Sequence, residues 1–422
     1  MTDVNTIVII GAGLAGDTAA AALRTAGFQG SITLVGDEPH RPYDRPPLSK
    51  AALVSAEKAQ KIFFHPATWY EEKNIALVLG DAAARVDPKA HSVTLASGRS
   101  LPYDKLLIAT GTRARRPRSL ENVGAPIFYL RTLDDSEALR PILKPGAHLA
   151  IIGAGVIGME VAASAVSLGC QVAVIELADR VMARSVSPAV SRFLTEYHRS
   201  KGVQILCGVK IIGVGVHEGR AVIELNGGTR IEADAVVAGV GAEPVTELAQ
   251  EAGLRVEDGI IVDRHTRTSD PDIHAAGDVT RFDSLRQKRH IRTEHWRHAV
   301  EQAEIAARAM LGDETPYEER PWMWSDQYEL NIQITGEGNA EVEVFRGRPE
   351  DGRFTIFQLR AGHLVGAVTV NQSKFKRQIV ELVAAQPALD PAVLADPATD
   401  LKKLVADLVD SAAQSVINTS DK

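Results

Sequence analysis

Apolar residues in this chain gather into short runs that are followed by glycine turns and amphipathic stretches. Residues 5–10 predict a strand, 11–16 a glycine turn, 17–27 an alanine-rich helix and 31–35 a second strand. The same order returns over residues 148–176. Because these apolar runs lack strict alternation, we expect parallel strands that are covered on both faces. The pattern therefore predicts two βαβ units.

The rest of the pattern predicts more strands, two further helices and a C-terminal part of different character. Hairpin-like strands are expected around 76–79 and 92–95, and helices near 188–201 and over 293–311. After residue 321 several strands follow one another, and helices are expected after residue 371. Such a run of strands followed by helices is typical of a separate α+β unit. The expected strands of the middle and C-terminal parts are 203–206, 210–216, 221–225, 233–241, 329–334, 340–347, 353–359 and 363–370.

Composition narrows the function classes. The 422 residues are 45% hydrophobic and 24% charged, which is typical of a globular protein, and suggest two or three domains. A formal net charge of −7 argues against broad nucleic-acid binding. No apolar run approaches the roughly 20 residues that span a bilayer, and the first strand leaves no room for a signal peptide. We therefore expect a cytoplasmic protein without membrane or nucleic-acid partners.

The chain has only two cysteines, Cys170 and Cys207. They form no CxxC pair and indicate neither a disulfide framework nor a metal site. We expect both to be buried, unreactive thiols, because free cysteine packs as a small hydrophobic residue.

Each glycine turn has the context of a dinucleotide site: a strand before it, a helix after it, and an acidic residue at the end of the next strand. The glycines are Gly11, Gly13 and Gly16 in the first turn, and Gly153, Gly155 and Gly158 in the second. The first glycine permits the tight turn, the second lets backbone approach a pyrophosphate, and the third allows close helix packing. Glycines that serve packing alone are the alternative for either copy. Both copies together predict two bound dinucleotides.

The acidic residues of these turns are Asp37 and Glu176. A carboxylate accepts hydrogen bonds from ribose hydroxyls and repels a 2′-phosphate, so Glu176 favours NADH over NADPH. Arg180 and Arg184 lie nearby in the sequence and leave that preference open.

Several stretches resemble the FAD-dependent ferredoxin reductases, a family that includes putidaredoxin reductase and the reductase components of aromatic-ring dioxygenases. The resemblance covers essentially the whole chain, in the order IVIIGAGLAGDTAA, RPYDRPPLSK, LLIATGTRAR, IIGAGVIGMEVA, GVGAEP, HAAGDV, EHWRHAVEQA and WSDQYELNIQ. It implies an α/β, glutathione-reductase-like fold with two Rossmann-type dinucleotide-binding domains and a C-terminal α+β domain. The implied domains are FAD-binding (1–110 and 244–318), NAD-binding (111–243) and C-terminal (319–422).

The resemblance also implies which residues bind the cofactors. Lys50 would stabilise the negative charge of reduced flavin, and Glu160 would orient the nicotinamide carboxamide; these two are the predicted catalytic residues. In the segment LVGDE, Asp37 and Glu38 compete for the FAD ribose, and the resemblance favours Asp37. The predicted FAD-binding residues are Gly11, Gly13, Ala15, Gly16, Asp37, Arg45, Lys50, Ala83, Arg131, Asp278, Glu294, Trp296, Val300 and Trp324. The predicted NAD-binding residues are Gly153, Gly155, Gly158, Glu160, Glu176, Arg184 and Gly241. No metal site is predicted.

The implied reaction transfers a hydride from NADH to the flavin. Disulfide reductases of this fold carry a CxxxxC pair after the first βαβ unit, where this chain has RPPLSK. We therefore expect electrons to leave one at a time, without a thiol relay, to a 2Fe–2S ferredoxin docked near the flavin edge. That ferredoxin would serve a cytochrome P-450 monooxygenase or a ring-hydroxylating dioxygenase.

Partner and acceptor leave alternatives open. Such ferredoxins are acidic, so the basic segments 286–292 and 374–377 are candidate docking sites, with solvated surface charge as the alternative explanation for each segment. Another acceptor (rubredoxin, monodehydroascorbate or a quinone) is the alternative activity. An NADH-sensing flavoprotein like the apoptosis-inducing factors is a third interpretation. A monomer or weak homodimer is expected.

Overall fold

The computed structural model describes residues 4–338 and 340–408, and the chain divides into two compact units. The first unit comprises the chain up to Pro47, Ala56–Arg115 and Gly241–Glu319. The second comprises Leu48–Ser55, Arg116–Val240 and the chain from Arg320 onward. In the described ranges, no helix combines the length and apolar character that crossing a membrane requires.

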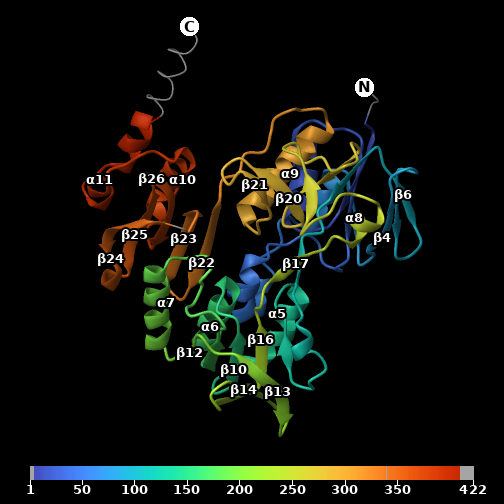
Figure 1. The fold of residues 1–422 in the computed structure, drawn as a ribbon. Coiled ribbons are helices and arrows are strands. Elements are labelled where there is room, and N and C mark those ends of the chain that lie inside the picture. The colour runs from blue at the N-terminus through green and yellow to red at the C-terminus, as the bar shows by residue number, and fades with distance from the viewer. Residues whose placement is uncertain (1–3, 339, 409–422) are drawn as a thin grey trace. The chain divides into compact units, whose positions relative to one another are not determined.

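A five-stranded parallel sheet of order β19-β7-β1-β2-β3 forms the centre of the first unit (Figure 1). Its strands are β1 (Thr6–Ile10), β2 (Ser31–Gly36), β3 (Ile75–Leu79), β7 (Lys105–Ile108) and β19 (Ile273–Ala275). Helices α1 (Leu14–Thr25) and α9 (Trp296–Met310) pack against each other beside this sheet. The first predicted βαβ unit is confirmed.

The expected hairpin around 76–79 is wrong. Strand β3 pairs in parallel with β2, with Leu34 opposite Leu77. A short apolar run carries no information on strand direction, and the long connection from β2 to β3 leaves room for a crossover. The second expected strand, β5 (Ser92–Leu95), instead pairs antiparallel with β4 (Ala83–Asp87) and β6 (Ser100–Pro102).

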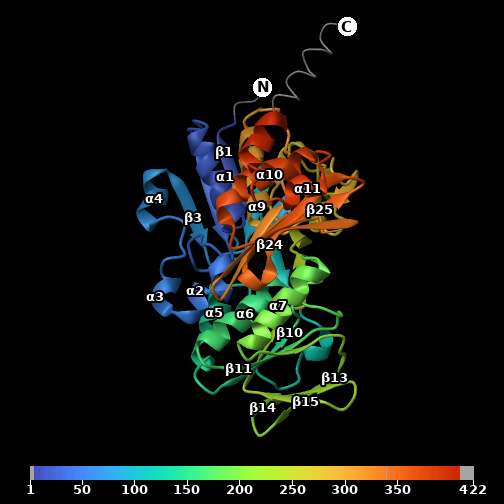
Figure 2. The same cartoon turned by 90° about the vertical axis from the view of Figure 1, so that its left-hand side faces the viewer.

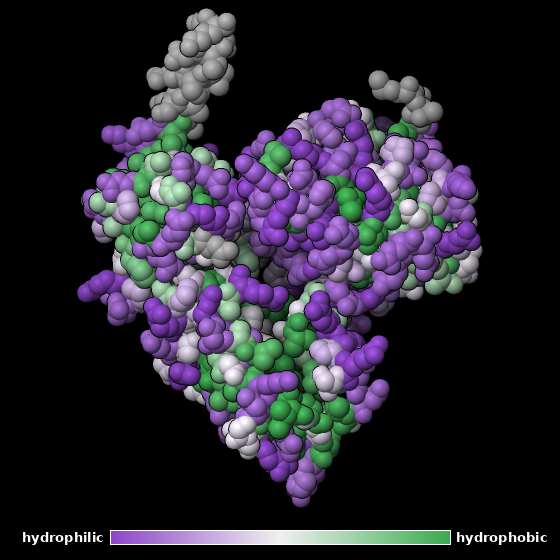
Figure 3. Space-filling model, viewed as in Figure 1, coloured by the Kyte–Doolittle hydropathy of each residue, from purple (hydrophilic) through white to green (hydrophobic). Residues whose placement is uncertain are grey.

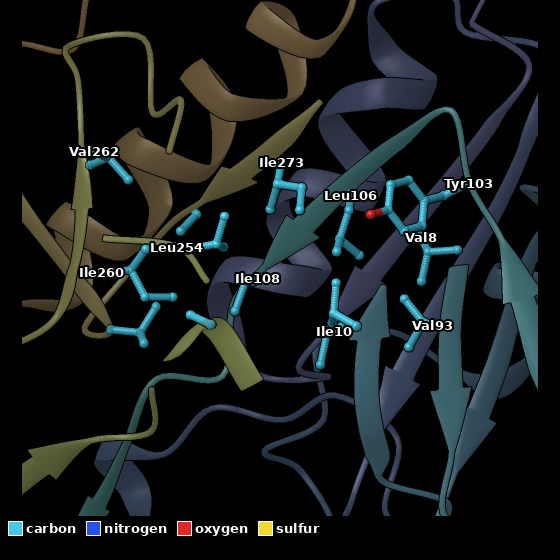
Figure 4. Close-up of a cluster of buried hydrophobic side chains, with 14 of the residues drawn as sticks. Val8, Ile10, Val93, Tyr103, Leu106, Ile108, Leu254, Ile260, Val262 and Ile273 are labelled. Atoms are coloured by element: carbon cyan, nitrogen blue, oxygen red, sulfur yellow. The ribbon is translucent and has the colours of Figure 1, made fainter. Parts of the chain in front are cut away.

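Apolar side chains from segments of this unit that are distant in the sequence form one core (Figure 4). Val8 and Ile10 of β1 meet Leu106 and Ile108 of β7, and Ile273 of β19 joins them. Burial of such residues is the dominant favourable term in folding, and here it joins the start of the chain to the segment after Gly241. The other elements of the unit are α3 (Ala56–Ala59), α4 (Ala67–Glu72), β8 (Thr112–Ala114), β17 (Ala242–Pro244), α8 (Glu247–Glu251), β18 (Ile260–Val262), β20 (Thr280–Ser284) and β21 (Arg289–Ile291).

The second unit contains another five-stranded parallel sheet, of order β12-β11-β10-β16-β9. Its strands are β9 (Ile127–Phe128), β10 (His148–Ile152), β11 (Gln171–Ile175), β12 (Gln204–Leu206) and β16 (Ala235–Ala238). Helix α6 (Val156–Ser167) follows β10, and α7 (Pro188–Ser200) follows β11, as Figure 2 shows. The second predicted βαβ unit is therefore confirmed.

A small antiparallel sheet of β13 (Ile211–His217), β14 (Arg220–Leu225) and β15 (Arg230–Ala233) extends this half of the unit. In Figure 3, apolar surface gathers over the part of the second unit that holds β13. Ile212 and Val216 of this strand are exposed large apolar side chains. The remaining helices here are α2 (Ala51–Val54) and α5 (Leu133–Leu139).

The C-terminal part of the second unit is an antiparallel sheet of order β22-β23-β26-β25-β24, followed by α10 (Lys376–Ala385) and α11 (Pro391–Ala395). Four of its strands are predicted by the apolar pattern: β23 (Leu330–Gly336), β24 (Val342–Arg348), β25 (Arg353–Arg360) and β26 (His363–Val370). The edge strand β22 (Trp322–Gln327) is not predicted, because its apolar start WMW is followed by the polar residues SDQ, which interrupt the apolar pattern. Its Ser325 and Gln327 are nevertheless fully buried.

Candidate functional site

The first glycine turn lies between β1 and α1. Gly11 has φ of +113°, and a Cβ there would lie 2.2 Å from the carbonyl oxygen of Ala109. A Cβ on Gly16 would lie 1.9 Å from the Gly11 oxygen. A Cβ on Gly13, at the N-terminus of α1, meets nothing within 4 Å. The fold therefore requires the first and third glycines, whereas the second leaves open space over backbone N–H groups where a phosphate fits.

The second turn, between β10 and α6, repeats this geometry. Gly153 has φ of +100°, and its Cβ would lie 2.3 Å from the oxygen of Gly239. A Cβ on Gly158 would lie 2.1 Å from the Gly153 oxygen, and one on Gly155 meets nothing within 4 Å. Two open cradles at helix N-termini fit two pyrophosphates.

The two acidic residues are held differently. Glu176 accepts the backbone N–H of Ala154 at 2.6 Å and that of Ala178 at 2.8 Å, which fixes its carboxylate beside the second turn. Asp37 is exposed at the end of β2 and accepts the backbone N–H of Glu38 at 3.0 Å.

The hydrogen-bond partners of Asp37 and Glu38 show which carboxylate is already engaged by other residues. Glu38 accepts hydrogen bonds from the Tyr43 hydroxyl at 2.5 Å and from the Arg45 guanidinium at 2.6 Å. Its carboxylate is thus engaged in the loop after β2, which favours Asp37 as the ribose acceptor. Arg45 acts here as the partner of Glu38.

The segment HAAGDV, which contains Gly277 and the predicted FAD-binding residue Asp278, lies beside the first glycine turn. Gly277 has φ of +84°, and a Cβ there would lie 3.1 Å from the Cβ of Ala15 and 3.7 Å from that of Ala299. The Gly277 N–H donates to Gln302 Oε1 at 2.8 Å, which anchors the turn to α9. Val300, on the same helix, is partly buried.

Other predicted residues of the first unit are more dispersed. Trp296 begins α9, and its indole N–H donates to Asp44 at 3.0 Å. Glu294 forms an ion pair with Arg292 at 2.5 Å, and Ala83 begins β4. Gly241 has φ of +109°, and its carbonyl accepts the N–H of Arg115 at 3.0 Å.

A buried carboxylate cluster occupies the second unit. Glu160 of α6 is only 4% exposed and accepts hydrogen bonds from the hydroxyls of Ser49 and, at 2.8 Å, Ser325. The Lys50 ammonium lies 3.2 Å from the same carboxylate. Burial raises the pKa of Glu160, and Lys50 and the two hydroxyls act in the opposite direction.

The segment that carries Lys50 belongs to the second unit. Pro46–Ser49 form a 3-10 turn, and Lys50 caps the short helix α2. The Ser164 hydroxyl donates to the Ser49 carbonyl at 2.7 Å, and the Ser136 hydroxyl donates to the Leu48 carbonyl at 3.0 Å. These bonds fix Lys50 against α6.

Three more predicted residues lie in this unit. Arg131 precedes α5 and donates its backbone N–H to Asp135 at 3.0 Å. Trp324 stacks on Trp322, with ring centroids 5.2 Å apart, and Lys50 Nζ lies 5.6 Å from its ring. Arg184 is exposed in the loop after β11.

Arg180, whose nearness left the NADH preference open, is used structurally. Its guanidinium donates to the carbonyls of Val186 at 2.7 Å and Ala183 at 2.8 Å. This arginine therefore folds its own loop.

Both cysteines are free and lie in the second unit. Cys170 is buried as expected, but Cys207 is only partly buried, because it follows the short edge strand β12. Burial raises the pKa of both thiols, which keeps them protonated and weakly nucleophilic.

Sequence reasoning missed four residues around Glu160: Ser49, Ser325, Gln327 and His198. Polar residues inside an otherwise apolar strand, as in WMWSDQ, are the one signal that points to two of them. No sequence signal points to His198, because a histidine near the C-terminus of a helix is usually solvated. In the structure it is fully buried.

Two protein-family models match the chain. A family model described as pyridine nucleotide-disulphide oxidoreductase matches residues 5–303, and one described as reductase C-terminal matches residues 322–405. The chain is 41% identical over 379 residues to the 3-phenylpropionate/cinnamic acid dioxygenase ferredoxin–NAD(+) reductase component of Photorhabdus laumondii. That alignment covers 90% of this chain and 96% of its relative.

Two solved structures are similar over nearly the whole chain. The ferredoxin reductase for the CYP199A2 system from Rhodopseudomonas palustris gives a TM-score of 0.90 at 38% identity, covering 95% of this chain and 100% of that one. The covalent putidaredoxin reductase–putidaredoxin complex gives a TM-score of 0.90 at 36% identity, covering 96% and 99%. The resemblance and the fold class predicted from the sequence are confirmed.

Proposed function

Because the chain belongs to the pyridine nucleotide-disulphide oxidoreductase family, we propose that it is an FAD-containing reductase that passes electrons from NADH to a 2Fe–2S ferredoxin. The observation that carries the proposal is the repeated glycine geometry, in which both turns leave an open backbone cradle at a helix N-terminus. A single-nucleotide enzyme needs one such cradle.

NADH is proposed for the second turn. Glu176, fixed beside that turn, receives the ribose hydroxyls and disfavours a 2′-phosphate. Glu160 offers a buried carboxylate that accepts a hydrogen bond from the nicotinamide carboxamide. Because it already receives two hydroxyls and an ammonium, its orientation is set before the nucleotide binds.

FAD is proposed for the first turn. Gly13 leaves room for the pyrophosphate, Asp37 is exposed for the ribose, and Gly277 brings the Asp278 turn beside Ala15, where a ribityl chain fits. When bound, FAD accepts a hydride from NADH and releases electrons singly. The chain's own residues supply position and charge, and the family resemblance gives Lys50 the role of stabilising the negative charge of reduced flavin.

The acceptor is proposed from the comparisons and from the cysteines. The relatives are named ferredoxin–NAD(+) reductase components, and one structure holds a reductase bound to putidaredoxin. Neither Cys170 nor Cys207 lies near the RPPLSK segment in the sequence, so a thiol relay is not part of the proposal. The ferredoxin would serve a ring-hydroxylating dioxygenase or a cytochrome P-450 monooxygenase, and we propose a cytoplasmic location.

Two basic segments are proposed as docking sites. In 286–292, Lys288 and Arg289 are exposed. In 374–377, Lys376 lies 3.4 Å from the Trp322 ring centroid and Arg377 pairs with Glu381 at 2.9 Å. Charge reversal by Arg289→Glu and by Arg377→Glu tests each segment separately. At the docking segment the ferredoxin KM should rise about tenfold at low salt, with the NADH KM unchanged. If neither reversal changes the ferredoxin KM, both segments are wrong.

Steady-state turnover of the FAD-loaded protein tests the function. NADH oxidation should be rapid with a 2Fe–2S ferredoxin and slow with rubredoxin, monodehydroascorbate or a quinone. Preference for one of the latter acceptors would replace ferredoxin as the proposed partner. A reduced protein that none of these acceptors reoxidises would support an NADH sensor.

A further inference from the structure

A buried chain of hydrogen bonds leads from Glu160 to helix α7. Ser325 Oγ donates to Glu160 Oε1 at 2.8 Å, and Gln327 Nε2 donates to Ser325 Oγ at 3.0 Å. Gln327 Oε1 lies 2.9 Å from His198 Nε2. Ser325, Gln327 and His198 each have 0% exposure. The chain thus links three elements, α6, β22 and α7, without contact with bulk water.

The polarity of this chain is fixed by chemistry. A serine hydroxyl has one proton, and Ser325 gives it to Glu160, so its oxygen accepts from the Gln327 amide. The Gln327 oxygen then requires a donor, which makes His198 Nε2 the protonated ring nitrogen. His198 Nδ1 is left to accept from the Tyr328 hydroxyl at 3.4 Å. The hydrogen bonds that link Tyr328, His198, Gln327 and Ser325 therefore all run toward the carboxylate, and the second N–H of Gln327 donates to Met182 Sδ at 3.5 Å.

The histidine at the far end stays neutral. Burial lowers the pKa of His198 to about 4, and the bond to Gln327 opposes this shift. The groups that face its ring are Gln327 at one nitrogen and Tyr328 at the other, with the Tyr328 ring 5.0 Å away. A neutral imidazole with a defined tautomer can hold the Gln327 amide in one orientation, because the reversed amide would set two donors against each other.

Packing alone does not call for these groups. Buried polar side chains stabilise little compared with apolar ones of equal shape, and they cost free energy if any partner is lost. A chain in which every buried polar group has its hydrogen-bond partner holds the side chain at its end in a single orientation. Here that side chain is Glu160.

We propose that Ser325, Gln327 and His198 are positioning residues, which hold the Glu160 carboxylate in the orientation that binds the nicotinamide carboxamide. The inference rests on the proposed function, because Glu160 is taken as the nicotinamide ligand. It gives strand β22 of the C-terminal sheet, and helix α7, a part in binding the nucleotide whose cradle is the glycine turn between β10 and α6.

The test compares variants of His198 and Gln327 in the full-length, FAD-loaded protein. His198→Leu removes the N–H that donates to Gln327, and Gln327→Leu removes the amide that joins His198 to Ser325. His198→Gln keeps an N–H near the position of Nε2. The dissociation constant for NAD⁺, measured by calorimetry, should rise about three- to thirtyfold for the two leucine variants. It should stay within about twofold of wild type for His198→Gln. Nitrogen-15 NMR of His198 in the wild-type protein should show a protonated Nε2 and a bare Nδ1.

Several outcomes would overturn the positioning role. It is wrong if the leucine variants bind NAD⁺ as wild type does, or if His198 carries its proton on Nδ1. A purely structural chain would lower the melting temperature of the variants and leave NAD⁺ affinity unchanged. If a leucine variant does not fold, Ser325→Ala, which removes one hydroxyl, provides the same comparison. Failure of the wild-type protein to bind NAD⁺ would instead contradict the proposed function itself.

Discussion

At the scale of single residues, the second glycine of each turn differs from its neighbours. Gly11 and Gly153 have positive φ, and Gly16 and Gly158 would each bring a Cβ to about 2 Å from a backbone oxygen. Gly13 and Gly155 have ordinary backbone angles and open space in front of them. Their glycine character therefore serves a ligand, not the fold.

Gly155→Ala tests this distinction. The free energy of unfolding of the nucleotide-free protein should change little, because the added methyl meets no atom within 4 Å. The NADH KM should rise about tenfold or more, since the methyl occupies the space of the pyrophosphate. Steady-state kinetics and denaturant unfolding measure the two effects.

Gly158→Ala is the matched control. Its Cβ would lie 2.1 Å from the Gly153 oxygen, so this variant should lose stability before it loses affinity. If Gly155→Ala destabilises the protein as much as Gly158→Ala does, the open cradle is wrong.

Glu176→Gln tests the nucleotide preference. The amide oxygen can still accept one backbone N–H, but the charge that repels a 2′-phosphate is gone. The ratio of kcat/KM for NADPH to that for NADH should rise about tenfold. An unchanged ratio would mean that another residue selects the nucleotide.

At the scale of elements, a buried acid joins α4 to α1. Asp17, in the first turn of α1, accepts the Tyr70 hydroxyl at 2.6 Å, and His65 Nε2 lies 3.3 Å from its other oxygen. Burial raises the pKa of Asp17, and Tyr70 and His65 oppose the shift. The glycine turn is thus held from behind by a segment far along the chain.

Tyr70→Phe should destabilise the protein by about 1–3 kcal/mol, because it leaves a buried carboxylate without one donor. Tyr103→Phe is the control: the Tyr103 hydroxyl is buried and has no hydrogen-bond partner among the described residues. That variant should be neutral or slightly stabilising. Equal losses in urea unfolding for both variants would contradict the role given to Asp17.

The elements also show what the sequence can predict. Both βαβ units follow from apolar runs and glycine spacing, because those signals are local. The direction of β3 does not, because it depends on pairing with β2 across a long connection. Strand β22 pairs with β23, which follows it directly, but its buried serine and glutamine interrupt the apolar pattern that would have predicted it. Family resemblance predicts Lys50 and Glu160. It does not predict Ser325, Gln327 and His198, because only the fold brings strand β22 and helix α7 together with Glu160.

At the scale of the whole molecule, three buried histidines make stability depend on pH. Burial lowers the pKa of His198 and His274 to about 4 and that of His298 to about 3. In the unfolded chain these histidines bind a proton with the ordinary histidine pKa of 6.5. Their contribution is therefore complete above pH 6.5 and is lost as the pH falls toward 4 for His198 and His274 and toward 3 for His298.

We expect the free energy of unfolding to fall across this window by up to about 1.4 kcal/mol per pH unit for each group. His274→Asn should reduce the slope, and the same change at the exposed His217 should not. Urea unfolding from pH 7 to pH 4 measures it. Equal slopes in wild type and His274→Asn would show that His274 is not held neutral.

We propose that the molecule binds two dinucleotides and passes electrons from the flavin to the ferredoxin without a relay through cysteine thiols. Anaerobic titration of the FAD-loaded protein with NADH tests this directly. One equivalent of NADH per FAD should bleach the flavin completely, and added oxidised ferredoxin should then restore its colour. A protein that binds no FAD, or one that consumes a second equivalent of NADH to reduce a disulfide, would contradict the proposal.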